Sequence, residues 1–307
     1  MQTFVFPQTP KVPALAATTG FFDGVHRGHC AVIQQLTTMA QQHGLPSAVV
    51  TYAPHPRVVL QQEQSLQLLT TTEEKEGLLA AQNLDYLFII PFTLSFAQLT
   101  AADFLQHYLR EQLSVNQLVM GYNQRIGSDG ASDFDVLKNI CNSLKINVLQ
   151  AQPVIENGVE VSSTKIRQAL SEGNVALANR MLGYPYALSG TVVHGKHNGH
   201  KIGFPTANLD VPANKLLPLD GVYAVRVNVA GVCYGGMLNI GYNPTLSAHN
   251  ALTIEVHLFD FQQDIYGKPL TISLIERLRD EQKFTSLQAL QQALQQDEGR
   301  ARLMVFG

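Results

Sequence analysis

Two histidines, His26 and His29, stand three residues apart in a stretch that also contains Gly20, Gly24 and Gly28. Side chains at this spacing can meet on one side of a helix start, and glycines let the backbone approach a ligand closely. Backbone N–H groups at a helix start favour a phosphate, and two imidazoles there could stabilise the charge on an attacked α-phosphate. Metal ligands or plain loop residues would give the same spacing, so these alternatives stay open.

A second group of polar residues runs from Val161 to Arg167, just past the middle of the chain. Ser163 and Thr164 offer hydroxyl groups at an expected helix start, and Arg167 can hold a phosphate through two parallel hydrogen bonds. An ordinary capped helix with solvated basic side chains would look the same. If the histidines bind a phosphate, this segment is the candidate for the other half of their site.

A third group lies early in the second half of the chain, where Gly203 precedes Thr206 and Asn208. The last two alternate along an extended segment and so face one side, and their hydroxyl and amide oxygens suit Mg²⁺ on nucleotide phosphates. Glu255 lies among apolar residues of an expected strand, where a buried carboxylate needs a partner or a role such as that of a base. The alternatives are that Thr206 and Asn208 satisfy backbone groups and that Glu255 faces solvent.

Composition limits the classes of protein to which the chain can belong. Its 307 residues are 45% hydrophobic and 15% charged, with a net charge of −3, which indicates a globular chain of about two domains. The lack of a run of about 18 apolar residues predicts that no segment spans a membrane, and the N-terminus lacks the features of a signal peptide. Without a basic block, broad nucleic-acid binding is not expected. Three widely spaced cysteines fit a reducing cytoplasm.

The strands and helices that must position these residues follow one pattern in the first half of the chain and another in the second. Strands and helices alternate in the first half, which predicts an α/β fold with a doubly wound parallel sheet and helices on both faces. The expected strands cover 14–19, 45–52, 86–90, 118–120 and 146–149, and the expected helices cover 30–43, 73–84 and a segment capped by Thr100. Gly44 is placed to end the first helix. The histidine group then follows the first strand, at the carboxyl edge where such sheets bind ligands.

From about Gly183 onward, expected strands follow each other at short spacing. They cover 189–194, 222–229, 232–240, 252–259 and 270–276, followed by one helix over 286–296. Ala230 and Gly231, which stand between two of them, predict a hairpin turn. The pattern predicts an antiparallel β-barrel with a C-terminal helix, in two domains that cover 1–183 and 184–307, with 175–182 as the connecting helix. The polar trio of Thr206, Asn208 and Glu255 is expected inside the barrel.

The first two groups together resemble the HxGH nucleotidyltransferase superfamily, and more narrowly the FMN adenylyltransferase module of prokaryotic FAD synthetases. The resemblance rests on two segments, from Gly20 to His29 and from Ser162 to Arg167. The resemblance implies a catalytic role on ATP for His26, His29 and Arg167. It also implies that a further set of residues binds the nucleotide, namely Gly20, Phe22, Asp23, Gly28, Ser163 and Thr164.

The segment from Gly121 to Gly127 resembles the flavin-holding loop of the same family. The resemblance implies that Asn123 binds the flavin. Gln124 and Ile126 stand where the family usually has Phe. A weaker or retuned adenylyltransferase is the alternative that these two departures suggest.

The second half of the chain, about 189–297, resembles riboflavin kinase through the segment from Gly203 to Asn208 and through several strand motifs downstream. The resemblance implies that Thr206 and Asn208 hold Mg-ATP, with Lys201 and Gly203 also binding the nucleotide. It implies that Glu255 is the catalytic base and that Arg279 binds the flavin. His200 replaces the Arg that is common in the family.

The combined resemblance implies a bifunctional cytoplasmic enzyme. Its second domain would phosphorylate riboflavin to FMN, and its first would adenylylate FMN to FAD with release of pyrophosphate. ATP is the implied co-substrate and Mg²⁺ the implied cation, with riboflavin and FMN as small-molecule partners and with neither nucleic acid nor membrane. A flavin-binding regulatory paralogue is the alternative outside enzymes.

Overall fold

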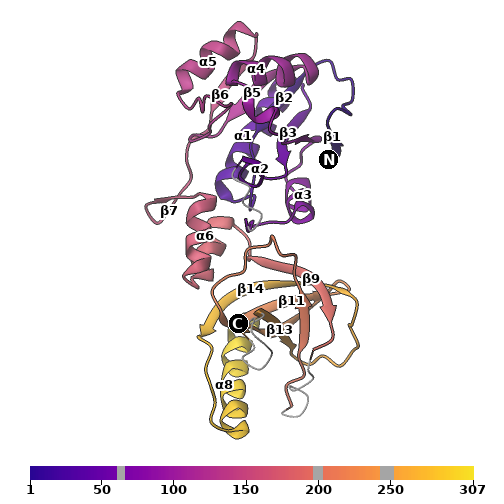
Figure 1. Ribbon diagram of the computed structural model, residues 1–307, viewed down its shortest axis with the longest axis vertical. Coiled ribbons are helices and arrows are strands. Elements are labelled where there is room, and N and C mark those ends of the chain that lie inside the picture. The colour runs from indigo at the N-terminus through magenta and orange to yellow at the C-terminus, as the bar shows by residue number, and fades with distance from the viewer. Residues whose placement is uncertain (61–65, 196–202, 243–251) are drawn as a thin grey trace. The chain divides into compact units, whose positions relative to one another are not determined.

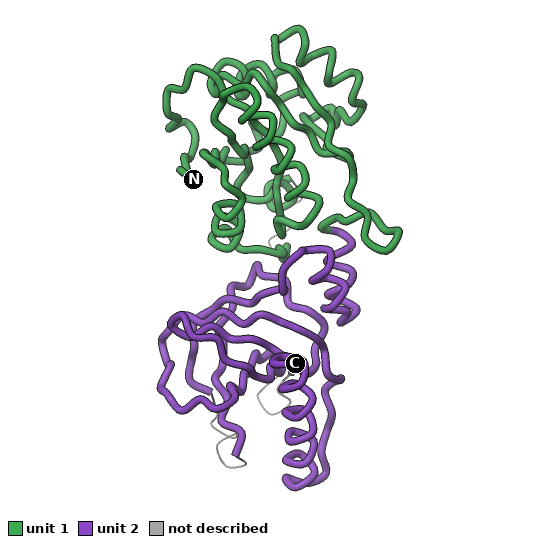
Figure 2. Tube along the Cα trace, turned by 180° about the vertical axis from the view of Figure 1, so that it is seen from behind, with its two compact units in different colours: residues 1–163 green, residues 164–307 purple. Residues whose placement is uncertain are grey.

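The computed structural model describes residues 1–60, 66–195, 203–242 and 252–307. These residues form two compact units, Met1–Ser163 and Thr164–Gly307 (Figure 2). Helices α6 (Ser163–Ser171) and α7 (Val175–Leu182) thus group mainly with the second unit, in which Asn179 donates its amide to the carbonyl of Leu274 at 2.9 Å. The functional boundary after residue 183 stays a prediction. No helix among the described residues is long and apolar enough to cross a bilayer.

The first unit is built on a six-stranded sheet in the order β1-β4-β3-β2-β5-β6, and every pair in it is parallel. The strands are β1 (Gln2–Val5), β2 (Leu15–Thr19), β3 (Ser47–Ala53), β4 (Tyr86–Pro91), β5 (Val115–Met120) and β6 (Asn147–Gln150) (Figure 1). Five residues of β2 in a row are buried, as expected for a central strand covered on both faces. Sequence analysis missed β1, which has only one neighbour.

Helices cover both faces of this sheet, which confirms the doubly wound prediction. They include α1 (Arg27–His43), α2 (Pro56–Leu60), α3 (Thr72–Ala80), α4 (Ala101–Asp103), the π-type segment η2 (Phe104–Gln112) and α5 (Phe134–Ser143), with a short 3₁₀ turn η1 (Phe96–Gln98). Ile33 of α1 and Leu79 of α3 pack on one face with Ala16 of β2. Leu105 of η2 packs on the other face with Ala17 of the same strand. Successive side chains of β2 therefore pack against the helices on opposite faces of the sheet.

Local signals explain where these helices begin and end. Gly44 ends α1 in the left-handed region with φ 63°, and its N–H bonds to the carbonyl of Ala40. Thr100 caps α4 in a box with Asp103. Both ends agree with the sequence analysis. Helix α5 had no comparable signal in that analysis.

The second unit is a closed antiparallel barrel in the order β10-β13-β12-β11-β14-β9. Its strands are β9 (Ala187–Val193), β10 (Ala207–Asp210), β11 (Gly221–Val229), β12 (Val232–Tyr242), β13 (Leu252–Leu258) and β14 (Pro269–Arg279) (Figure 1). Ala230 and Gly231 turn between β11 and β12 with φ 51° and 87°, as the hairpin prediction requires. Closure of the sheet leaves no free edge.

One helix, α8 (Leu287–Phe306), covers the outside of the barrel. Its residues Ala301 and Val305 join a core cluster with Val222 of β11 and Met237 of β12. The helix extends ten residues beyond the predicted end at Gln296, because its last turns also bury apolar side chains against the strands.

Candidate functional site

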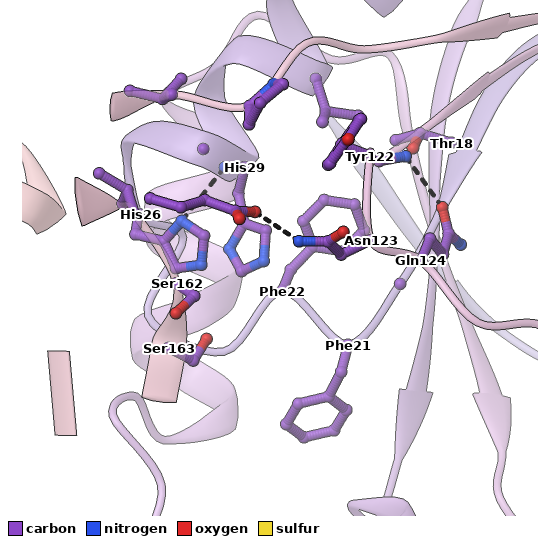
Figure 3. A pocket seen from close by; sticks show the side chains of 18 of the residues that line it. Thr18, Phe21, Phe22, His26, His29, Tyr122, Asn123, Gln124, Ser162 and Ser163 are labelled. Carbon is purple, nitrogen blue, oxygen red and sulfur yellow. Dashed lines mark hydrogen bonds between the residues drawn. The ribbon is translucent and has the colours of Figure 1, made fainter. Parts of the chain in front are cut away.

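The first site is a cavity of about 330 Å³ at the carboxyl end of β2. It is lined by His26 and His29 with Ser162 and Ser163 near them, and by Asn123 and Gln124 from another loop (Figure 3). A short hairpin of β7 (Ile155–Glu156) and β8 (Val159–Glu160) contributes Glu160 to the lining. All these residues belong to the first unit. The structure therefore brings the histidine group and the start of the Ser-rich segment together.

The two imidazole rings of the site stack on each other. Their centroids lie 3.6 Å apart with 17° between the planes, and Nδ1 of His26 accepts the backbone N–H of His29 at 3.3 Å. His26 is thereby the N-cap of α1, and its remaining proton is assigned to Nε2. A Cβ at Gly28 would lie 3.1 Å from the His26 ring, so the glycine in HxGH leaves room for this stacking.

Burial keeps both imidazoles neutral near pH 7. It lowers the pKa of His26 to about 4. Burial also lowers the pKa of His29 well below its usual value, and repulsion from His26, when that ring is protonated, and from the Lys75 ammonium adds to that effect. Nδ1 of His29 is buried and has no hydrogen-bond partner within the described residues. A neutral imidazole with an unused nitrogen at a helix start is suited to bonding a phosphate oxygen.

The loop between β2 and α1 is fixed from several sides. Phe22 is 3% exposed, has φ 55° and places its ring 5.0 Å from the His29 ring. Asp23 accepts the backbone N–H groups of Leu69 and Thr70 at 3.2 and 3.1 Å. A Cβ at Gly20 would lie 3.2 Å from the Phe22 ring. Phe22 and Asp23 therefore shape the loop around the cavity.

The Ser-rich segment meets this loop through its first helical residue. Ser163 donates its hydroxyl to the carbonyl of Asp23 at 3.0 Å. Thr164 is exposed and Arg167 half-buried, and both follow in α6 within the second unit. Arg167 follows Ser163 by four residues in the helix, so the two side chains lie on the same helix face. The roles of Thr164 and Arg167 stay predictions.

The loop that carries Asn123 is fastened by its own side chains. The amide of Asn123 donates to Glu160 Oε1 at 2.6 Å. Gln124 accepts the N–H of Gly121 at 3.1 Å (Figure 3). It also donates its side-chain amide to the carbonyl of Thr19 at 2.6 Å. Gln124 thus ties this loop to the end of β2 by polar contacts, where the family usually has an aromatic ring.

Two further positions complete this loop. Ile126 is 5% exposed and packs in the core under η2, so it fills apolar space where the family has Phe. Gly127 has φ 75°, and a Cβ there would clash with the backbone of Ala101, which leaves no room for another residue.

The second site lies on the barrel. Strand pairing sets Asn208 of β10 opposite Glu255 of β13, and Glu255 opposite Asn239 of β12. Residues directly opposite each other share one face of a sheet, so the three polar side chains form a row across three strands. Thr206, just before β10, donates its hydroxyl to Glu255 Oε2 at 3.2 Å. The structure thereby brings the predicted trio together.

The row faces outward, and its predicted location inside the barrel is wrong. His257 shares the face of Glu255 and is paired with Met237, which packs with α8 outside the barrel. The neighbours of Glu255 in β13, Ile254 and Val256, are buried on the opposite face. An alternating strand leaves its polar face outside a small barrel, because side chains fill the interior.

A cavity of about 420 Å³ lies over this outer face. Its lining includes Thr206, Glu255 and Arg279, with Leu290 and Leu294 of α8 as an apolar wall. A planar apolar ligand with a polar end would suit such a lining.

Arg279 is held in place at this cavity. Its guanidinium contacts Asp297 of α8 at 2.8 and 2.9 Å, and Asp297 is 3% exposed. The same guanidinium lies 5.6 Å from the centroid of the Phe284 ring. Arg279 therefore presents a fixed polar group next to apolar side chains.

The segment before β10 that is expected to bind the nucleotide is described only in part. Gly203 has φ 82° and Phe204 is buried. Lys201 and His200 lie outside the described residues.

The oxygen donors near Glu255 fit a cation that arrives with a nucleotide. The side chains present are the Thr206 hydroxyl, the Asn208 amide and one carboxylate. In the described part of the chain, no group of three or more His, Cys, Asp or Glu could hold a metal ion. Mg²⁺ typically keeps waters and binds one or two protein groups plus substrate phosphates, which this donor set matches.

Sequence analysis missed several residues that line or support the two sites. Glu160 and Asn239 hydrogen-bond to residues of the sites, and Lys75 lies under the loop at the first site. Glu160 immediately precedes Val161 of the Ser-rich segment, and Asn239 lies in the expected strand over 232–240. Lys75 had no signal, because it stands among glutamates that look like a solvated helix face.

Two family models match the chain in succession. The model described as FAD synthetase matches residues 9–165, and the model described as riboflavin kinase matches residues 182–305.

Curated relatives match nearly the whole chain. A bifunctional riboflavin kinase/FMN adenylyltransferase from Listeria monocytogenes is 40% identical, over 95% of this chain and 91% of its own length. The protein of the same description from Escherichia coli strain K12 is 38% identical, over 93% of this chain and 91% of its own length.

A solved structure is similar along its full length. It is a chain from Streptococcus pneumoniae described as a macrolide-efflux protein, with a TM-score of 0.90, 32% identity and 98% of both chains covered. That description differs from those of the family models and of the curated relatives, which agree with each other in both halves of the chain.

Proposed function

We propose residue roles from the premise that this chain belongs to the family of bifunctional riboflavin kinase/FMN adenylyltransferases. Its two activities use ATP as co-substrate, and its small-molecule substrates are riboflavin and FMN. A weakened transferase and a non-catalytic paralogue are not favoured, since both halves match in the order of the bifunctional relatives.

In the kinase reaction, we assign the base to Glu255. Its carboxylate would take the proton of the riboflavin hydroxyl, while the hydroxyl oxygen bonds to the γ-phosphorus of ATP and ADP leaves. The hydrogen bond from Thr206 holds that carboxylate beside the nucleotide-binding segment. Arg279, fixed by Asp297, would hold the flavin in the same cavity.

In the adenylyl transfer, an oxygen of the FMN phosphate would attack the α-phosphorus of ATP, and pyrophosphate would leave. His26 and His29 would donate hydrogen bonds to phosphate oxygens and stabilise the developing charge. Arg167 would add its positive charge to the same phosphates. No covalent enzyme intermediate is required, and Asn123 would hold the flavin part of FMN.

The remaining nucleotide contacts follow the family pattern. At the first site they are Gly20, Phe22, Asp23, Gly28, Ser163 and Thr164. At the second site they are Lys201, Gly203, Thr206 and Asn208.

Mg²⁺ would arrive with ATP, and Thr206 and Asn208 would be its protein ligands at the kinase site. Bound there, the cation would neutralise charge on the phosphates. The oxygen donors near Glu255 support this assignment.

The proposal also covers domain organisation and location. Residues 1–183 would carry adenylyl transfer and residues 184–307 the kinase. A cytoplasmic location is supported by three free cysteines and by the use of ATP.

The observation that carries the proposal is that each family-matched half contains a cavity lined by the polar groups its reaction needs. The test is to incubate the purified chain with riboflavin, ATP and Mg²⁺ and to separate the flavins by chromatography. FMN should form first and FAD second. If neither product forms in an ATP-dependent manner, the proposal is wrong.

A further inference from the structure

A buried lysine, Lys75 of α3, lies beneath the loop that carries the nucleotide-binding histidines. Its residue is 5% exposed. Lysine is almost never buried to this extent without specific partners, and none of the roles assigned above uses it.

The partners of Lys75 lie in the loop and in the neighbouring strand. Its ammonium donates to the carbonyl of Phe21 at 3.4 Å and to Thr51 Oγ1 at 3.3 Å. It also lies 4.5 Å from the centroid of the Phe21 ring. Both the backbone and the ring of Phe21 therefore contact one buried cation.

The carbonyl that Lys75 contacts belongs to the peptide unit between Phe21 and Phe22. Phe22 has φ 55°, which is unusual for a bulky residue and persists only where its surroundings enforce it. Thr51 also donates to the Phe21 carbonyl, at 3.2 Å. With that carbonyl held on two sides, the Phe22 ring stays against the His29 ring.

We propose that Lys75 is a positioning residue for adenylyl transfer. Its ammonium holds the Phe21–Phe22 peptide, so that Phe22 keeps His29 stacked on His26 where the ATP phosphates bind. The inference rests on the proposed function of this site, and Lys75 itself does not touch substrate.

A purely structural role would not need a charge at this position. Without Lys75, the Phe21 carbonyl would keep its bond from Thr51, so an apolar side chain of similar length would leave that carbonyl paired. Burial lowers the pKa of Lys75 to about 8, against the opposing effect of Asp23 and Glu76. The charged form is thus destabilised by its surroundings, as is common for groups kept for activity.

The other titratable groups near Lys75 lie on its own helix and on the elements packed against it. Asp23 and His29 face it from the loop and from α1, and Glu76 is its neighbour in α3. His55, which follows β3, packs against the Phe21 ring that Lys75 also contacts. The centroids of the His55 and Phe21 rings lie 4.1 Å apart. These groups must be kept when Lys75 is replaced.

The test uses Lys75→Met and Lys75→Arg in the full chain, with Lys138→Met as the matched control at an exposed lysine of the same unit. FAD formation from supplied FMN is measured for kcat and for the KM of ATP. FMN formation from riboflavin serves as an internal control, because it depends on the other unit. Thermal unfolding is followed for each variant.

We expect Lys75→Met to lower kcat for FAD formation about 10²-fold, as small misplacements of reacting groups do, with little change in KM. Its Tm should equal or exceed that of the wild type, and FMN formation should not change. Lys75→Arg, which keeps the charge, should be at least about tenfold more active than Lys75→Met.

Four results would overturn the inference. Three are kinetic: a wild-type kcat in Lys75→Met, a rise in KM with kcat unchanged, and equal activity of Lys75→Met and Lys75→Arg. The fourth is a lower Tm that accounts for the lost activity. If the wild-type chain itself makes no FAD, the proposed function fails instead, which this design separates from a failure of the Lys75 role.

Discussion

The hydroxyl of Thr206 donates to Glu255 Oε2 at 3.2 Å, which joins the end of the segment proposed to bind the nucleotide to a carboxylate of the neighbouring strand β13. Glu255 also stands directly opposite Asn208 in the strand pairing. Residues proposed to hold Mg-ATP thus surround the proposed base, so the position of that base depends on the elements that bind the nucleotide.

Replacing Glu255 with Gln removes the base while keeping the shape of the side chain. FMN formation should fall about 10²- to 10⁴-fold, the usual contribution of general base catalysis. FAD formation from supplied FMN should stay within about twofold, because the first unit is unchanged. The control is Glu276→Gln, at an exposed position of β14. FMN formation near the wild-type rate in Glu255→Gln would show that the base is elsewhere.

Replacing His29 with Ala should have the opposite effect. Loss of a preorganised donor at a transition state typically lowers kcat by about 10²- to 10³-fold, so FAD formation should drop while FMN formation continues. His107→Ala, at an exposed histidine of the same unit, should leave both rates intact. Equal loss of both activities in His29→Ala would contradict the assignment of one reaction to each unit.

Stability should decrease as the solution becomes acidic, because His26 is neutral in the fold. Its pKa is about 4 in the folded chain and 6.5 in the reference state. Between these pH values the unfolded chain binds the proton and the folded chain does not. Unfolding should therefore become easier as pH falls from 6.5 to 4, by about 3 kcal/mol from this group, and burial of His29 acts in the same direction.

Denaturant unfolding at a series of pH values measures this effect. His26→Asn keeps a side chain able to cap α1 but removes the titrating ring, so its stability should depend less on pH. The same slope in wild type and variant would show that His26 is not the source.

The ion pair between Arg279 and Asp297 should matter for flavin binding and for stability. Asp297→Asn leaves the Arg279 guanidinium with a weaker partner in a partly buried place. We expect a loss of about 3 kcal/mol in unfolding free energy and a raised KM for riboflavin. Asp280→Asn, whose side chain is 80% exposed in its pair with Arg277, should change both by little. An unaltered KM in Asp297→Asn would separate Arg279 from flavin binding.

Gln124 offers a test of the loop that differs from the family. Gln124→Leu removes the hydrogen bonds to Gly121 and Thr19, each worth about 1 kcal/mol. The KM for FMN in FAD formation should rise about tenfold, as measured in initial-rate assays. A lower KM would mean that the polar contacts weaken flavin binding in this chain.

Much of the architecture could be predicted from the sequence because its signals are local. The alternation of apolar runs and the glycine at residue 44 predicted the first sheet and the end of α1, and Ala230-Gly231 predicted the barrel hairpin. The closeness of His26 and His29 followed from helical spacing alone. These features depend on neighbours in the chain.

Other features depend on tertiary contacts that a local pattern does not contain. The edge strand β1 and the last turns of α8 are stabilised by packing partners far away in sequence. The outward direction of Glu255 depends on which face of the barrel sheet α8 covers, a face marked by Met237 opposite His257. Lys75 is buried by a loop about 50 residues before it, and its neighbours gave no hint of this.

The row of Asn208, Glu255 and Asn239 makes the kinase chemistry sensitive to the length of β13. Deleting or inserting one residue there would rotate every following side chain by half a turn. A deletion before Glu255, for example, would turn its carboxylate toward the apolar centre and put Val256 at the position of the proposed base. Natural variation in this protein should therefore tolerate changes of residue type along β13 far better than changes in its number of residues.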